Sequence, residues 1–233
     1  METSLRGLLA LIFLAPVFLS PSLAAPAAKP HAGKGLIPTY LRCEYLVEPL
    51  GLQEPSPRLS WIVESGDRAQ RQTACHVIVA SKPELLAQDK GDLWDSAIVP
   101  GDETLCVPYT GKPLGSHQRC YWKVKVWDKD GLESPWSEPA SWTMGILKPV
   151  DWKGDWIGYD KPRAPFVGHG NSTSNVYLPP ATYFRTKFRL EKPVVRATLY
   201  ATALGLVDMH LNGRLVSEDY FTPGWCDYSK RVY

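Results

Sequence analysis

The sequence lacks the motifs that identify several enzyme classes. It has no G-x-S-x-G nucleophile motif and no glycine-rich phosphate loop, so neither an α/β-hydrolase nor a P-loop enzyme is indicated. Its five histidines include no pair four residues apart, and its five cysteines include no C-x-x-C spacing. These absences argue against a zinc site or a redox motif, and we expect neither a metal nor a cofactor.

An excess of charge of one sign is also missing. The 26 Lys and Arg residues against 24 Asp and Glu residues give a net charge of +2, and the basic residues are spread along the chain. This pattern leaves no electrostatic footprint for nucleic acid, so we expect no nucleic-acid partner. Five cysteines are too few and odd in number for a disulfide framework. Cys75 and Cys120 fall on strand positions, where the role of a small buried hydrophobe is favoured.

Long apolar runs are absent except at the N-terminus. There Arg6 precedes an apolar stretch over residues 7–19, and small residues follow at positions 22–24. The stretch is too short to span a bilayer and contains a proline, so residues 1–24 are predicted to be a signal peptide of a secreted or periplasmic protein. No other membrane association is expected. Residues 25–38, rich in Ala, Pro, Lys and Gly, are predicted to be a flexible linker.

Turn-forming and aromatic residues, in contrast, are abundant. The 21 prolines, 18 glycines and 26 aromatic residues (nine Trp, eleven Tyr and six Phe) favour short strands and turns over long helices. We expect strands at 41–47, 58–63, 75–80, 93–99, 104–109, 120–128 and 141–144. That count and rhythm predict an all-β fibronectin-III/immunoglobulin-like sandwich over residues 39–147, with one short helix at 83–90 and Trp61 in its core.

The clearest pattern lies between Cys120 and Met144. Lys123 and Lys125 alternate with an apolar face, and Asp128 to Gly131 supplies a turn before the strand at 141–144, so the segment predicts a β-hairpin. The apolar face consists of Cys120, Trp122, Val124 and Val126. The hairpin is a scaffold element and carries no chemistry.

A second domain is predicted after a join at 145–155. Residues 161–180 form a long loop with a glycosylation sequon at Asn171-Ser-Thr173, and strands are expected at 182–190, 194–203, 206–211 and 214–216, with Asn212-Gly213 as the turn before the last. Residues 148–233 therefore predict a truncated, partial jelly-roll-type β-sandwich. Its exposed edge and apolar face indicate a fragment of something longer.

Acidic residues are the candidates for the acid and the base that glycoside hydrolysis needs. They lie in turns or at strand entries, where capping or solvation is the expected role, so no catalytic residue is predicted. The residues concerned are Asp92, Asp95, Asp128, Asp130, Glu133 and Glu138.

One aromatic cluster keeps a binding function open. Trp225, Asp227 and Tyr228 place an indole, a carboxylate and a phenol in a loop after the second hairpin, which suits carbohydrate binding. The alternative is that Trp225 and Tyr228 pack the domain onto a neighbour.

Taken together, the motifs resemble the N-terminal region of bacterial α-L-rhamnosidases of glycoside hydrolase family 78. The resemblance covers nearly the whole predicted mature chain, in order. It rests on Leu41-Arg-Cys-Glu-Tyr-Leu46, Pro49-Leu-Gly51, Pro57-Arg-Leu-Ser-Trp61, Gln72, Gly91-Asp-Leu-Trp-Asp-Ser96, Tyr109-Thr-Gly111, Tyr121-Trp-Lys-Val-Lys-Val-Trp-Asp128, Trp136-Ser137, Met144-Gly145, Trp156-Ile157, Phe184-Arg185, Leu211-Asn-Gly213, Pro223-Gly-Trp225 and Asp227-Tyr228. The sequence departs from the family pattern at Cys75-His76 and at Cys226.

The resemblance implies an exported enzyme that removes terminal α-L-rhamnose from glycosides or polysaccharides by an inverting, two-carboxylate mechanism. The family's acid and base lie in an (α/α)6 barrel nearer the C-terminus, which this chain does not contain, so no catalytic residue is carried over. The expected partners are that catalytic domain in cis and, through the full-length enzyme, a rhamnose-containing carbohydrate. The chain alone should be inactive. The alternative is a non-catalytic secreted carbohydrate-binding or adhesion module.

Overall fold

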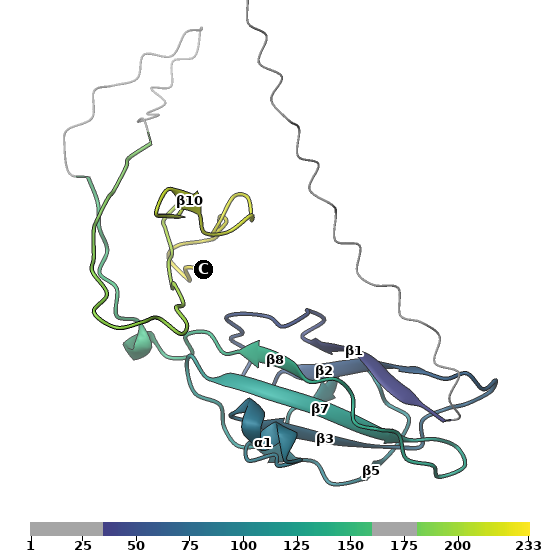
Figure 1. The fold of residues 1–233 in the computed structure, drawn as a ribbon. Coiled ribbons are helices and arrows are strands. Elements are labelled where there is room, and N and C mark those ends of the chain that lie inside the picture. Colours follow the sequence, from purple (N-terminus) through teal and green to yellow (C-terminus); the bar gives the residue numbers. More distant parts are fainter. Residues whose placement is uncertain (1–34, 160–180) are drawn as a thin grey trace, which may run out of the picture. The chain divides into compact units, whose positions relative to one another are not determined.

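The computed structural model describes residues 35–159 and 181–233 (Figure 1). The chain divides into two compact units after Trp156. This division lies next to the join predicted at 145–155. No helix in the described ranges is long and apolar enough to cross a membrane. The predicted signal peptide, the 161–180 loop and the Asn171 sequon lie outside the described residues.

The first unit is a sandwich of two antiparallel sheets. One sheet has the order β1-β2-β6 and the other β4-β3-β7-β8, with β5 also pairing with β3. The first sheet comprises β1 (Ile37–Cys43), β2 (Arg58–Glu64) and β6 (Val107–Pro108). The second comprises β3 (Ala74–Ala80), β4 (Trp94–Asp95), β5 (Val99–Pro100), β7 (Arg119–Trp127) and β8 (Ala140–Thr143). The prediction of an all-β, immunoglobulin-like sandwich is confirmed.

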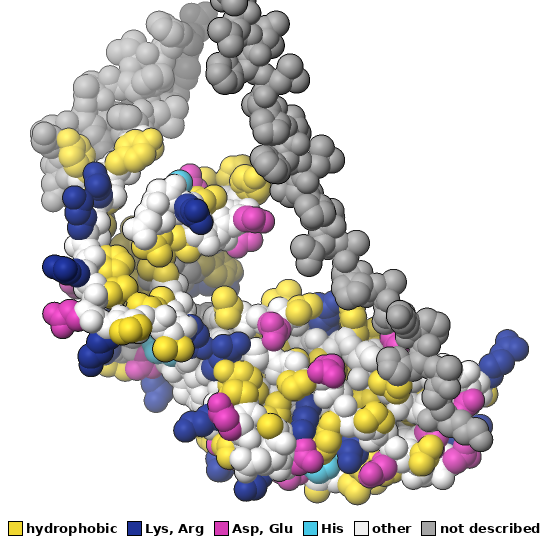
Figure 2. Space-filling view, viewed as in Figure 1, with side chains coloured by type: hydrophobic (Ala, Val, Ile, Leu, Met, Phe, Trp, Pro, Cys, Tyr) yellow, Lys and Arg dark blue, Asp and Glu magenta, His cyan; other side chains and the backbone are white. Residues whose placement is uncertain are grey.

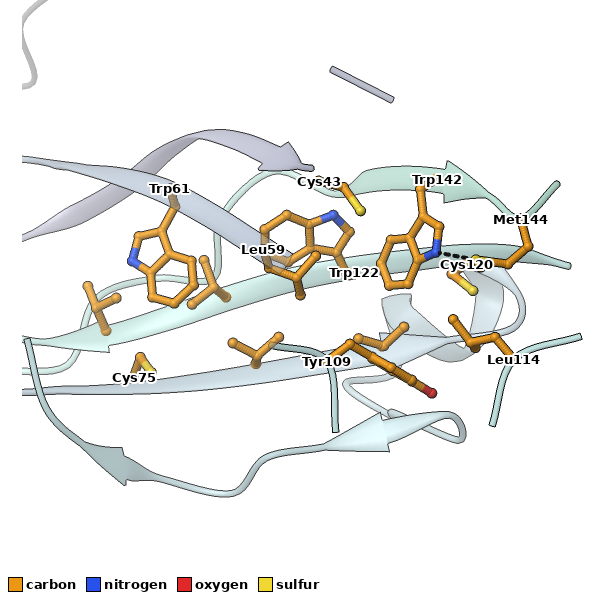
Figure 3. Close-up of a cluster of buried hydrophobic side chains, with 14 of the residues drawn as sticks. Cys43, Leu59, Trp61, Cys75, Tyr109, Leu114, Cys120, Trp122, Trp142 and Met144 are labelled. Atoms are coloured by element: carbon orange, nitrogen blue, oxygen red, sulfur yellow. Dashed lines mark hydrogen bonds between the residues drawn. The ribbon is translucent and has the colours of Figure 1, made fainter. Parts of the chain in front are cut away.

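The core between the sheets is built around three tryptophans (Figure 3). Trp61 of β2, Trp122 of β7 and Trp142 of β8 are each at most 1% exposed. Cys120, Val124 and Val126, which alternate with Trp122 along β7, are completely buried, as the period-2 pattern predicted. Strands β7 and β8 pair antiparallel, which confirms the predicted hairpin. The burial of Trp61 confirms its predicted core position.

The opposite face of β7 is less open to solvent than its lysines suggested. Helix α1 (Pro83–Ala87) packs Leu86 over Ile78 of β3, forming a small second cluster. Lys123 is only 7% exposed, and its ammonium group binds the carboxylate of Asp89 just after the helix. The indole of Trp136 lies 4.9 Å from the Lys123 Nζ atom. Alternation in the sequence predicts that this face is polar. Its burial depends on the tertiary structure, because helix α1 and the Trp136 indole cover it.

Several predicted boundaries were wrong. Strand β1 begins at Ile37, and Leu36 is 3% exposed, so the linker predicted for 25–38 ends before these residues. Beyond Cys43 the strand predicted at 41–47 stops, because Glu44 and Tyr45 adopt positive φ angles of 49° and 63°. Positive φ at Ala97 and Cys106 similarly breaks the strands predicted at 93–99 and 104–109. The helix predicted at 83–90 exists but ends at Ala87.

The second unit contains one two-stranded ladder among its described residues. Strands β9 (His210–Leu211) and β10 (Arg214–Leu215) pair antiparallel. Asn212 and Gly213 join them with φ angles of 51° and 79°, which confirms the predicted turn.

The other strands predicted for the second unit, at 182–190 and 194–203, are not formed, and no jelly-roll-type sandwich is present in the described part. The physical reason is that a strand needs a hydrogen-bonded partner and a surface that buries its apolar face. Alternation in the sequence supplies the apolar face alone. None of the residues described between 157 and 233 is buried.

Candidate functional site

The carboxylate of Asp128 lies at the start of the turn between β7 and β8 and is only 2% exposed. Its Oδ1 atom accepts hydrogen bonds from the backbone N–H groups of Asp130 and Leu132, both at 2.9 Å. Its Oδ2 atom accepts one from the Gln70 side-chain amide at 3.1 Å. The prediction that Asp128 caps turn amides is confirmed, and both of its oxygens hold the turn.

The remaining acidic residues of this turn are exposed. Asp130, Glu133 and Glu138 all lie at the surface, as the sequence predicted. Glu133 Oε1 lies 3.7 Å from the Nζ atom of Lys125, which is a surface ion pair of small energetic value. These carboxylates are solvated groups of a scaffold turn.

Asp92 and Asp95 also satisfy nearby donors. Asp92 accepts hydrogen bonds from the backbone N–H and the hydroxyl of Ser81, at 2.8 and 2.7 Å. Asp95 accepts from the backbone N–H of Ala97 at 2.9 Å and contacts His76 Nε2 at 2.7 Å. Partial burial acts to raise the pKa of both carboxyls, but the combined hydrogen bonds outweigh it and lower the pKa. Both residues therefore stay ionised and connect β3 to the segment that contains β4.

Three cysteines belong to the hydrophobic core. Cys43, Cys75 and Cys120 are buried free thiols, which confirms the packing role predicted for the last two. Burial raises the pKa of Cys75 to about 11 and that of Cys120 to about 12, so both stay protonated at neutral pH. In the described part of the chain, no group of three His, Cys, Asp or Glu residues could hold a metal ion.

The three residues predicted to bind carbohydrate lie together after β10. Residues 225–229 line a shallow, open hollow, and the Trp225 side chain is 89% exposed. Hydrogen bonds from Ser229, with a further contribution from Lys230, lower the pKa of Asp227. An exposed indole beside an ionised carboxylate can stack on a sugar ring and accept hydroxyl hydrogen bonds. These properties are compatible with the predicted role, which stays a prediction.

A hydrogen bond inside the sandwich explains why Gln72 stands among the residues that resemble the family. The Trp61 Nε1 atom donates to Gln72 Oε1 at 3.0 Å, and Gln72 is 3% exposed. The Gln72 amide in turn donates to the carbonyls of Gly101 and Glu103. Gln72 therefore satisfies the buried indole of Trp61 and fixes the loop after β5, a role that sequence reasoning missed. The sequence feature that could have indicated this contact is a glutamine eleven residues after a core tryptophan.

The Gly91-Asp-Leu-Trp-Asp-Ser96 motif is also structural. A Cβ atom at Gly91 would lie 2.1 Å from the carbonyl oxygen of Trp94, so only glycine fits there. The ring of Trp94 meets that of Tyr109 edge-on, with centroids 5.5 Å apart. The Tyr109 hydroxyl donates to the carbonyl of Lys112 at 2.7 Å. The motif therefore joins the edge of one sheet to the loop after β6.

The surface carries no concentration of a single charge on the face shown in Figure 2, where basic and acidic side chains are interspersed. The carboxylates of Asp92, Asp95 and Asp128 bind neighbouring donors, those of Asp130, Glu133 and Glu138 lie at the surface, and the motif residues pack the fold. The first unit is an immunoglobulin-like module.

Residues 38–148 match the Rha78A-like, N-terminal immunoglobulin domain, and residues 192–233 match the alpha-L-rhamnosidase N-terminal domain. The chain therefore corresponds to the N-terminal region of α-L-rhamnosidases. Its sequence is 37% identical over 198 residues to an alpha-L-rhamnosidase of Alteromonas sp. (strain LOR), a match that covers 84% of this chain and 21% of the relative. The chain thus spans about a fifth of the length of that curated relative.

Two solved structures agree with this assignment. The Streptomyces avermitilis alpha-L-rhamnosidase complexed with L-rhamnose has a TM-score of 0.51 and 41% identity, over 53% of this chain and 12% of that one. The alpha-L-rhamnosidase from Dictyoglumus thermophilum has a TM-score of 0.53 and 33% identity, over 55% and 14% of the two chains. The resemblance inferred from the sequence motifs is confirmed for the N-terminal region.

Proposed function

We propose that this chain is the N-terminal accessory part of an exported α-L-rhamnosidase, and that residues outside it perform the hydrolysis of terminal α-L-rhamnose. The observation that carries the proposal is the presence of two α-L-rhamnosidase N-terminal domains in one chain. The chain accounts for about a fifth of a relative that bears this name.

The contacts of the acidic side chains also support the proposal that residues outside this chain perform the hydrolysis. An inverting glycosidase needs one carboxylic acid to protonate the leaving oxygen and one carboxylate to activate water. In the sandwich, Asp128 holds a turn, Asp92 binds Ser81, and Asp95 binds Ala97 and His76. These groups contribute to folding, and the acid and base are assigned to the catalytic domain in cis.

The proposal predicts that the purified chain does not hydrolyse an aryl α-L-rhamnoside. The matched comparison is a longer protein expressed from the same gene with its downstream reading frame, which should release the aryl alcohol. Turnover by the 233-residue chain above the rate of a buffer blank would overturn the assignment of chemistry to other residues. A natural stop after codon 233 would instead favour a secreted adhesion or carbohydrate-binding module.

A second candidate function is carbohydrate contact at Trp225, Asp227 and Tyr228, favoured by the 89% exposure of the Trp225 side chain beside an ionised carboxylate. Titrating L-rhamnose into the chain should change its tryptophan fluorescence, and Trp225→Ala should abolish that change. Trp156→Ala is the matched control, because it removes another exposed indole, at 61%, outside the hollow. If neither the parent chain nor the control responds to sugar, this site is refuted.

A further inference from the structure

The polypeptide remains attached to the sandwich after its last strand ends. Strand β8 stops at Thr143, yet the next residues stay bound to two loops of the first unit. The Gly145 N–H donates to the Leu52 carbonyl at 2.7 Å, and the Gly145 carbonyl accepts from the His117 N–H at 3.0 Å. A Cβ atom at Gly145 would lie 2.6 Å from the Gly51 carbonyl oxygen, so the two backbones touch.

Residues 145–151, called here the exit segment, are held further along by side chains. The Gln53 amide donates to the Ile146 carbonyl at 3.2 Å. The Leu147 N–H donates to the Ser116 hydroxyl at 2.8 Å, and the Leu147 side chain packs against the main core. The exit segment therefore continues the tertiary structure of the sandwich.

Ser116 fixes the far end of the exit segment as well. Its hydroxyl accepts from Leu147 and donates to Asp151 Oδ2 at 2.5 Å, so one side chain binds two points four residues apart. Between these points lies the short 3₁₀ helix η1 (Pro149–Asp151), which begins with Pro149. The Asp151 N–H donates to the Lys148 carbonyl at 2.9 Å. A proline fixes its own φ angle and so leaves this turn little freedom.

We propose that the exit segment is a rigid connector, which sets the direction in which the chain leaves the sandwich as far as Asp151. The predicted join at 145–155 would then contain no hinge in its first seven residues. A rigid connector makes the immunoglobulin-like unit an orienting support for whatever follows it. The inference does not depend on the proposed function, because every contact used lies within the first unit.

The proposal is tested by ¹⁵N relaxation on the full chain. Backbone order parameters of residues 146–148, 150 and 151 should match those of β7, about 0.85, whereas a flexible linker gives values below about 0.6. Values in the flexible range in the unsubstituted chain would overturn the proposal.

Two substitutions then test the contacts. Ser116→Ala should speed hydrogen exchange of the Leu147 amide at least about fivefold, since it removes that acceptor, and should lower the order parameters up to residue 151. Asp151→Ala should loosen residues 150–151 and leave the Leu147 amide protected. Ser65→Ala is the matched control, because its exposed hydroxyl accepts only a local bond from Asp67. Unchanged exchange of Leu147 in a folded Ser116→Ala chain would refute the role of Ser116.

Discussion

Trp122→Ala is expected to destabilise the immunoglobulin-like unit by about 3–5 kcal/mol, the range found when a buried tryptophan is truncated in a packed core. Trp122 is completely buried and belongs, with Cys43 and Leu59, to the core cluster drawn in Figure 3. Because whole domains are stable by only about 5–15 kcal/mol, this change removes a large share of the total. Urea unfolding followed by tryptophan fluorescence measures the loss.

Two comparison variants separate packing from hydrogen bonding. Trp122→Phe should cost less than Trp61→Phe, because the Trp122 Nε1 atom has no protein acceptor, whereas loss of the Trp61 N–H deprives Gln72 of its donor. The exposed control Trp156→Ala should change stability by no more than about 0.5 kcal/mol. A loss below about 1 kcal/mol for Trp122→Ala would show that the core does not depend on this indole.

Asp128→Ala is expected to cost about 2 kcal/mol, the second-largest effect. It removes the acceptor of two backbone N–H groups in the β7–β8 turn and of the Gln70 amide. A buried donor left without a partner costs roughly 1–3 kcal/mol. Because Asp130 and Leu132 lie in the exposed part of the turn, water can replace the carboxylate as their acceptor, so the total should stay near the cost of one unpartnered donor. Thermal unfolding followed by circular dichroism gives the change.

The conservative variant sharpens this test. Asp128→Asn keeps one acceptor oxygen for the turn amides, and its new NH₂ group can donate to Gln70 Oε1, which has no partner in the parent structure, once the Gln70 amide flips. Its cost should be less than half that of Asp128→Ala. Asp130→Ala, at an exposed position of the same turn, should be close to neutral. Equal losses for all three variants would contradict a capping role.

The fold of the first unit was largely predictable because its strands follow a period of two residues. Alternation placed Cys120, Trp122, Val124 and Val126 on the core face, and the structure confirms all four. The Asn212-Gly213 turn was predictable for a local reason too, since these residues tolerate the positive φ that the turn needs. The boundaries were less predictable, because Glu44 and Cys106 adopt positive φ without a sequence signal.

Residue type alone predicts Trp225, Asp227 and Tyr228 as candidate binding residues, and all three line one open hollow in the structure. The strands predicted at 182–190 and 194–203 are not formed in the described part of the second unit. Side chains at 182–190 alternate, but the described residues supply neither a pairing strand nor a buried face for them.

The sequence by itself determined the sandwich, its tryptophan core, the capping role of Asp128 and the relationship to α-L-rhamnosidase N-terminal regions. Each of these depends on local alternation, on turn chemistry, or on motifs in a fixed order. Only the tertiary structure decided that Lys123 is buried under Trp136, that Gln72 holds the Trp61 indole, and that Ser116 and Gln53 bind the exit segment. These contacts join residues between 11 and 93 positions apart, and no periodic pattern encodes such a pairing.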